Sequence, residues 1–169
     1  MQGATLVSVE EYLSSSYEGD RDYVDGVLEE RNWGDFDHAR LHSELLCYMA
    51  NRARQWNVCV LPSLRIRIGP TRFRVPDLCV FPRGQEIEQI PTKPPLICIE
   101  VLSPEDKWSR FESHIQDFLA MGVERVWVFD PQEHDIFECT RNRRRLVLED
   151  LLEAPPVSIK ISELMAELD

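Results

Sequence analysis

Two apolar runs between residues 73 and 102 each carry one acidic residue, and this pattern constrains the fold more than any other stretch. The first run reads FRVPDLCVF and contains Asp77, whereas the second reads PPLICIEVL and contains Glu100. The second run is rich in β-branched residues and is apolar apart from its acid, which is typical of a strand buried on both faces. We therefore expect both acids to lie in or beside a buried sheet.

A buried carboxylate needs a partner, because an isolated charge in the protein interior is very costly. Two acids directed at one point from neighbouring strands would form a hard-oxygen site that suits Mg²⁺ or Mn²⁺. The alternative is a buried acid that is neutralised by one of the many arginines of this chain. The spacing of the two acids leaves both interpretations open.

The length of 169 residues predicts a single domain that spans residues 1–169. No apolar stretch approaches the roughly 18 residues that a membrane-spanning helix needs, so we expect no membrane partner. The first residues, MQGATLVSVEEYL, lack a basic segment followed by an apolar one, so no secretory signal is predicted. The five cysteines are scattered, which favours reduced thiols in a cytoplasmic protein.

The charge distribution is uneven. A net charge of −11 argues against a protein that coats nucleic acid by electrostatics alone. However, residues 51–76 contain six arginines and no acid, and a second basic run follows at Arg141–Arg145. We expect a local basic face that contacts DNA phosphates, and its candidate residues are Arg65, Arg67, Arg72 and Arg74, with Arg110 as a further candidate. The alternative is that these arginines protect exposed edge strands against aggregation.

The hydrophobic patterns predict an α/β fold, more specifically an α+β arrangement around a mixed sheet. Its central elements have the order α-β-β-β-α-β, and they are a helix over 38–55, strands over 58–68, 72–81 and 96–102, a helix over 103–121, and a strand over 125–130. We expect Asp37 to cap the first of these helices and Ser103 to cap the second. A capped helix and a hairpin precede this core, and a hairpin, a strand and a short helix capped by Ser162 follow it.

Several short motifs accompany this order of elements. They are Tyr23-Val-Asp-Gly26, His38, Val75-Pro-Asp77, Pro95-Leu96, Glu100-Val-Leu-Ser-Pro104, Gly122-Val123 and Trp127-Val-Phe-Asp-Pro131. With these motifs, nearly the whole chain resembles the Uma-type family of restriction endonucleases, within the PD-(D/E)xK (restriction-endonuclease-like) superfamily.

The resemblance implies a metal-dependent phosphodiesterase that acts on DNA. Asp77 and Glu100, with the main-chain carbonyl of Val101, would hold one or two Mg²⁺ or Mn²⁺ ions, and Asp22 would join the metal shell. His38 would contact a phosphate or carry a proton, although a single histidine at the start of a helix is more often structural.

The chain departs from the family pattern at the lysine. Leu102 stands at the third position of the E-x-K signature, and it has no group for proton or phosphate chemistry. Family members of this branch carry that lysine on the following helix, where His114 stands here, and Arg110 replaces the acid expected one turn earlier. We expect His114 to take the lysine's role, with Lys107 on the same helix face as the second candidate. The alternative is that His114 is a solvated helix residue.

Two functions follow as hypotheses. The first is a Mg²⁺- or Mn²⁺-dependent DNA endonuclease, for which two-strand cleavage would suit a homodimer. The second is a catalytically impaired family member that binds nucleic acid or protein, and the missing lysine and the net charge of −11 favour it.

Overall fold

The structure is a computed structural model that describes residues 5–32, 34–106 and 108–168. In chain order, its elements are α1 (Val9–Ser14), β1 (Arg21–Val24), β2 (Val27–Glu30), α2 (Phe36–Arg52), β3 (Val58–Pro62), β4 (Ile66–Gly69), β5 (Arg72–Arg74), β6 (Leu78–Pro82), β7 (Ile97–Val101), α3 (Trp108–Met121), β8 (Arg125–Asp130), β9 (Asp135–Thr140), β10 (Arg143–Leu146), β11 (Leu151–Ala154), β12 (Val157–Lys160) and α4 (Ile161–Ala166).

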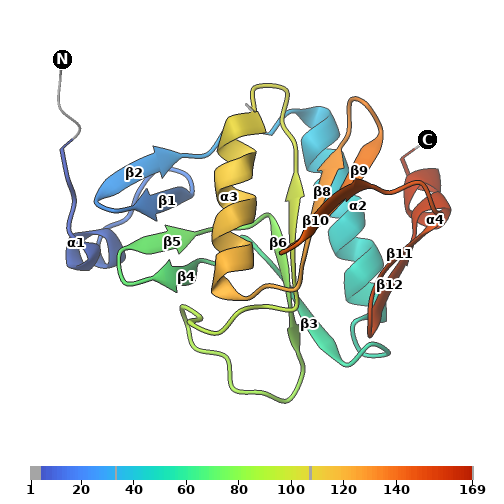
Figure 1. Ribbon diagram of the computed structural model, residues 1–169, viewed down its shortest axis with the longest axis horizontal. Helices are drawn as coiled ribbons and strands as arrows, with labels where there is room; N and C mark the ends of the chain where they lie inside the picture. The colour runs from blue at the N-terminus through green and yellow to red at the C-terminus, as the bar shows by residue number, and fades with distance from the viewer. Residues whose placement is uncertain (1–4, 33, 107, 169) are drawn as a thin grey trace.

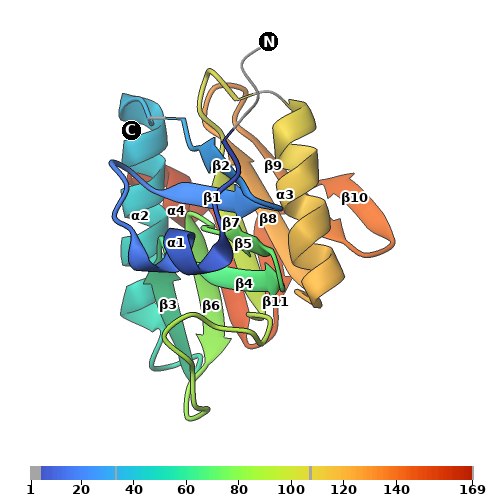
Figure 2. The same ribbon diagram turned by 90° about the vertical axis from the view of Figure 1, so that its left-hand side faces the viewer.

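A six-stranded sheet with the order β10-β9-β8-β7-β6-β3 forms the centre of the molecule. Only β7 and β8 pair in parallel within it, and helix α3 makes the crossover between them. Helices α2 and α3 lie on opposite sides of this sheet (Figures 1 and 2). Strand β7 is buried along its whole length, as its apolar sequence predicts.

The alternation of side chains along the strands decides which face each residue joins. Ile97, Ile99 and Val101 of β7 pack on the side of α2, whereas Cys98 packs on the side of α3. Glu100 therefore points toward α3, because its neighbours on both sides point toward α2. The period of two thus places the acid of β7 opposite the helix that carries His114.

The two long strands predicted over 58–68 and 72–81 are each divided between two sheets. Strands β3 and β6 belong to the six-stranded sheet, whereas β4 and β5 join the β1–β2 hairpin in a four-stranded sheet. Ser63 adopts a φ of 48°, which turns the chain between β3 and β4. Pro76 lies in the second junction and has no N–H to continue a ladder. The junction leaves Asp77 just before β6.

The helix starts differ from the predicted ones. Asp35, rather than Asp37, caps α2 by accepting a hydrogen bond from the N–H of His38. The segment from Ser103 forms a turn instead of the first turn of α3, because the carboxylate of Asp106 accepts the N–H of Ser103. Ser162 lies inside α4, and its N–H donates to Asp150.

The capped helix and the hairpin predicted before the core are confirmed. Ser8 caps α1 by accepting the N–H of Glu11, and Gly122 ends α3 with a φ of 112°. Asp25 and Gly26 both have positive φ in the tight turn between β1 and β2. The hairpin predicted after the core is present as β9 and β10, and Arg143–Arg145 of the basic run lie in strand β10.

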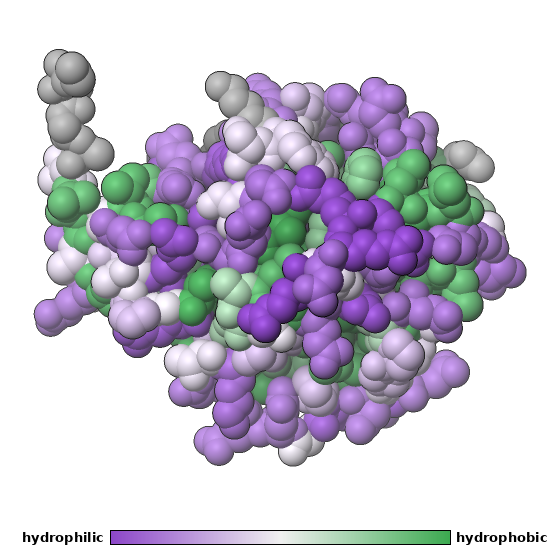
Figure 3. Space-filling model, viewed as in Figure 1, coloured by the Kyte–Doolittle hydropathy of each residue, from purple (hydrophilic) through white to green (hydrophobic). Residues whose placement is uncertain are grey.

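The outer surface carries separate apolar side chains between polar ones. In the view of Figure 3, hydrophilic residues separate several hydrophobic areas. The most exposed large apolar side chains, which include Leu6, Phe36 and Leu148, come from distant parts of the chain. Within the described ranges, no helix has the length and the apolar character that a membrane span requires.

Candidate active site

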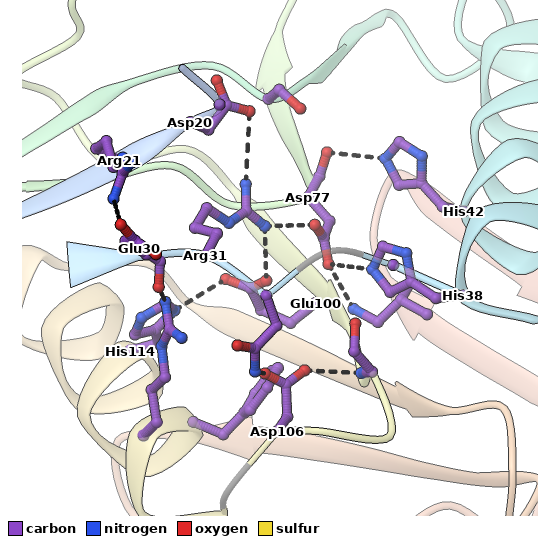
Figure 4. A pocket seen from close by; sticks show the side chains of 18 of the residues that line it. Asp20, Arg21, Glu30, Arg31, His38, His42, Asp77, Glu100, Asp106 and His114 are labelled. Carbon is purple, nitrogen blue, oxygen red and sulfur yellow. Dashed lines mark hydrogen bonds and ion pairs between the residues drawn. The ribbon is translucent and has the colours of Figure 1, made fainter. Parts of the chain in front are cut away.

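Asp77 and Glu100 lie side by side at the floor of one pocket. The antiparallel register of β6 and β7 places Leu78 opposite Ile99, so the two acids occupy the next position along the same pair of strands. Both side chains are buried, and Glu100 is only 1% exposed. The predicted convergence of two acids from neighbouring strands is thus present in the fold (Figure 4).

Arg31 lies between these two carboxylates. Its Nη2 atom is 2.5 Å from Oδ1 of Asp77 and 3.8 Å from Oε2 of Glu100. The sequence left a metal site and a neutralising arginine as alternatives. The structure places an arginine beside both acids, as the second alternative expects, and the metal site stays a prediction. The two acids form one concave oxygen-lined site, and a guanidinium compensates their charge within it.

The carboxylate of Asp77 is held in place from several sides. Its Oδ2 atom accepts a hydrogen bond from the main-chain N–H of Val101 at 2.8 Å and lies 3.6 Å from Nε2 of His38. The main-chain carbonyl of Asp77 lies 3.1 Å from a ring nitrogen of His42. Burial alone would raise the pKa of Asp77, but His38, Arg31 and the Val101 N–H lower this pKa below its ordinary value.

The pKa of Glu100 is shifted in the opposite direction to the pKa of Asp77. Burial, and then the neighbouring charge of Asp77, raise the pKa of Glu100 to about 7. Its Oε1 atom is buried and has no hydrogen-bond partner among the described residues. Two adjacent buried carboxylates with an unpartnered oxygen have the donor chemistry that hard divalent cations prefer. The residues present therefore fit a Mg²⁺ or Mn²⁺ ion.

His114 projects from α3 into the same site and is only 5% exposed. Its Nε2 lies 2.9 Å from Oδ2 of Asp22, and its Nδ1 lies 3.5 Å from Oε1 of Glu100. Neither ring nitrogen meets hydrogen-bond geometry in the part of the chain described. Its burial excludes the interpretation of His114 as a solvated helix residue.

The charge state of His114 follows from its two carboxylate neighbours. Burial by itself lowers the pKa of the imidazole, but the close carboxylates of Asp22 and Glu100 outweigh this effect and raise the pKa to about 9. In this arrangement the ring is protonated at neutral pH, so it presents a positive charge beside Glu100.

Asp22 lies on β1 and connects His114 to a buried ion-pair network. Its Oδ1 accepts the N–H of Val75, and its Oδ2 lies 3.2 Å from Nη1 of Arg74. The donor atoms of Asp22, Glu29 and His114 lie within 4.8 Å of one another, a spacing that a metal ion can bridge. Arg74 contacts both acids of this group, so its guanidinium already compensates part of their charge.

The arginines predicted to contact DNA have different surroundings. Arg74 is fully buried, and Arg72 pairs with Asp25 and Asp117, each at 2.8 Å, so both contribute to the framework of the fold. Arg65 lies over the ring of Tyr12 and Arg67 over the ring of Phe73. Both are half-buried at the side of the four-stranded sheet.

Two further residues that the sequence predicted for the site, Arg110 and Lys107, belong to α3 or to the segment before it. Arg110 lines the pocket and donates to the main-chain carbonyl of Glu30. Lys107, the second candidate for the lysine's role, lies outside the described residues. The segment just before it contributes Asp106, whose carboxylate accepts a hydrogen bond from Asn32 at the rim of the pocket.

Sequence analysis missed Arg31 and His42 as site residues. Arg31 belongs to a short segment between β2 and α2 that has no periodic pattern, and His42 lies one turn after His38 on α2. Only the general requirement that a buried acid be neutralised pointed to an arginine, and it did not identify which one.

Comparison with known proteins identifies a family and a similar fold. The model of the Uma2 family, described as "Putative restriction endonuclease", matches residues 9–167. Among solved structures, the chain is similar to a protein from Anabaena variabilis ATCC 29413 that is described as "a putative nuclease belonging to DUF820". The TM-score is 0.82 and the identity 22%, over 96% of this chain and 99% of the other. This likeness confirms the predicted fold. No curated protein matches the chain.

Proposed function

This chain belongs to the Uma2 family of putative restriction endonucleases, and on that premise we propose that it hydrolyses phosphodiester bonds in DNA with a divalent cation held by Asp77 and Glu100. The convergence of these two buried carboxylates at one pocket floor is the observation that carries the proposal. Asp22 and the main-chain carbonyl of Val101 are the further candidate ligands. Mg²⁺ or Mn²⁺ suits this oxygen-rich set.

The cation, when bound, supplies positive charge at the scissile phosphate and makes a nearby water more acidic. The protein's own residues then position the reactants. The N–H of Val101 orients the carboxylate of Asp77, which would be one of the two acids that hold the cation. A preorganised carboxylate of this kind costs no reorganisation during the reaction.

His114 takes the lysine's role in this proposal. Its position between Asp22 and Glu100 supports this role, because the ring places a positive group beside the attacking water or the charge that develops on phosphorus. His38 lies on the opposite side of the site, next to Asp77, where it can contact the phosphate or accept a proton.

Plasmid nicking in Mn²⁺ and in Mg²⁺ tests the proposal. We expect the parent protein to nick supercoiled DNA and Asp77→Asn to lose this activity while it keeps the parent's circular dichroism spectrum. Asp37→Asn is the matched control, because Asp37 is an exposed acid on α2 and lies outside the pocket lining. Retention of nicking in Asp77→Asn would overturn the assignment.

The second candidate function is a nucleic-acid or protein-binding module. Leu102 directly after β7 favours it, because no lysine follows Glu100 at the usual position. This hypothesis predicts binding that does not depend on a cation, and no turnover in any divalent ion. If DNA is the partner, the affinity should fall steeply with salt, and Arg65→Gln together with Arg67→Gln should reduce this slope.

A further inference from the structure

Arg31 already contacts one oxygen of each of the two carboxylates that would hold a cation. Its guanidinium faces Oδ1 of Asp77 and Oε2 of Glu100, and its side chain is only 17% exposed (Figure 4). A divalent ion coordinated by these oxygens would lie about 2.0–2.2 Å from each of them. The guanidinium therefore competes with a cation for these two oxygens.

We propose that Arg31 is the resident counter-ion of this site, and that a divalent cation binds only by displacing its guanidinium from Asp77 and Glu100. The inference rests on the proposed metal site and adds an element that regulates it. In the metal-free protein, Arg31 offsets the repulsion between two buried carboxylates. Cation binding must overcome this contact, so the apparent affinity falls in proportion to the small fraction of molecules with an open site.

The position of Arg31 in the chain allows such a displacement. The residue follows β2 directly and belongs to neither a helix nor a strand, so its movement breaks no hydrogen-bond ladder. Its Nη1 atom is also 3.9 Å from Oδ2 of Asp20, whose side chain is 53% exposed at the rim of the pocket. Asp20 therefore offers the guanidinium a second carboxylate on the way out of the site.

Arg31 thus has carboxylate partners at two depths at once, and we infer that it can keep the contact at the rim while it gives up the contact at the floor. At the floor it compensates Asp77 and Glu100, and at the rim it compensates Asp20 and leaves the floor open. A cation stabilises the second arrangement because it takes over the charge compensation at the floor. Removal of Arg31 should therefore strengthen cation binding, whereas removal of the rim carboxylate should weaken it.

Isothermal titration of the metal-free protein with Mn²⁺ tests this inference without DNA or turnover. We expect Arg31→Gln to bind Mn²⁺ about tenfold or more tightly than the parent. Arg40→Gln is the charge-matched control, because Arg40 contacts the main-chain carbonyl of Glu167 and is absent from the pocket lining. This tenfold difference should persist at about 0.5 M salt, because salt screens buried charges only weakly.

A second variant separates displacement from a general change in charge. Asp20→Asn should weaken Mn²⁺ binding by about two- to fivefold, which is the scale of an exposed ion pair. In the Arg31→Gln background the same substitution should leave the Mn²⁺ affinity unchanged, because no guanidinium remains for Asp20 to pair with. An equal loss in both backgrounds would show that Asp20 acts on the cation directly, and it would remove Asp20 from the inference.

The possible results are distinguishable. Equal Mn²⁺ affinity in the parent and in Arg31→Gln, or weaker binding in the variant, overturns the counter-ion role and leaves the proposed metal site intact. Binding in Arg31→Gln but not in the parent supports the counter-ion role in its strongest form. Absence of binding in both proteins overturns this inference and the metal-dependent function together. If Arg31→Gln does not fold, the Asp20→Asn titration alone decides, and unchanged affinity there overturns the displacement.

Discussion

The guanidinium of Arg74 donates a hydrogen bond from Nε to Oδ2 of Asp117 at 2.7 Å, and this contact ties the four-stranded sheet to helix α3. The same guanidinium also reaches Asp22 and Glu29. Because Asp22 in turn faces His114, the buried arginine sets the position of the helix relative to the site. Thus a residue of the basic segment supports the candidate active site from inside the fold.

Replacement of this arginine should be strongly destabilising. Arg74→Ala leaves the buried carboxylates of Asp22 and Asp117 without their shared partner, and we expect the free energy of unfolding to fall by about 3–5 kcal/mol. Chemical denaturation monitored by fluorescence measures the change. Arg52→Ala is the control, because its ion pair with Glu163 is exposed and should contribute about 0–1 kcal/mol. Similar losses in the two variants would contradict the structural role of Arg74.

Cation binding should stabilise the protein through the two acids of the pocket floor. A free Mn²⁺ concentration 100 times the dissociation constant should raise the free energy of unfolding by about 2.7 kcal/mol. Asp77→Asn and Glu100→Gln should lose this increment, whereas Asp37→Asn should keep it, and a chelator should reverse it. An unchanged increment in Asp77→Asn, measured by thermal denaturation, would place the bound ion elsewhere.

The role of His114 can be tested by substitutions that remove or replace its positive charge. His114→Gln removes the positive charge, and we expect nicking to slow by about 100-fold or more. His114→Lys returns an ammonium group to the same helix position, so its rate should exceed that of His114→Gln. If His114→Gln nicks DNA at the parent's rate, the lysine's role belongs to another group, and Lys107 is the next residue to substitute.

The thiols should differ in reactivity according to their burial. Burial raises the pKa of Cys79 to about 12, so only about one molecule in 10⁴ carries this thiolate at pH 8. Cys98 is fully buried and also has a raised pKa, whereas Cys47 is exposed. Iodoacetamide should therefore modify Cys47 first and should modify Cys79 and Cys98 only after unfolding. Mass spectrometry of tryptic peptides follows each site, and rapid labelling of Cys98 in the native protein would contradict the packing of β7.

Much of the local structure was predictable because its signals lie within a few residues. Ser8 three residues before Glu11 specifies a helix cap, and the apolar run around Glu100 specifies a buried strand. The divided strands were not predictable in the same way. Residues 58–68 have an uninterrupted strand-like composition, and only the packing of two separate sheets decides that β3 and β4 pair with different partners.

The sequence by itself determined that Glu100 belongs to a buried strand and that Asp77 lies beside one, since burial and period depend on neighbouring residue types. The family motifs in it also pointed to the helix position of His114. Only the tertiary structure decided which charges meet: Arg31 from one connection, Asp22 from a distant hairpin and His114 from a helix converge on one pocket. The physical reason is that electrostatic interaction depends on distance and burial in the folded state, whereas separation along the chain carries almost no information about either.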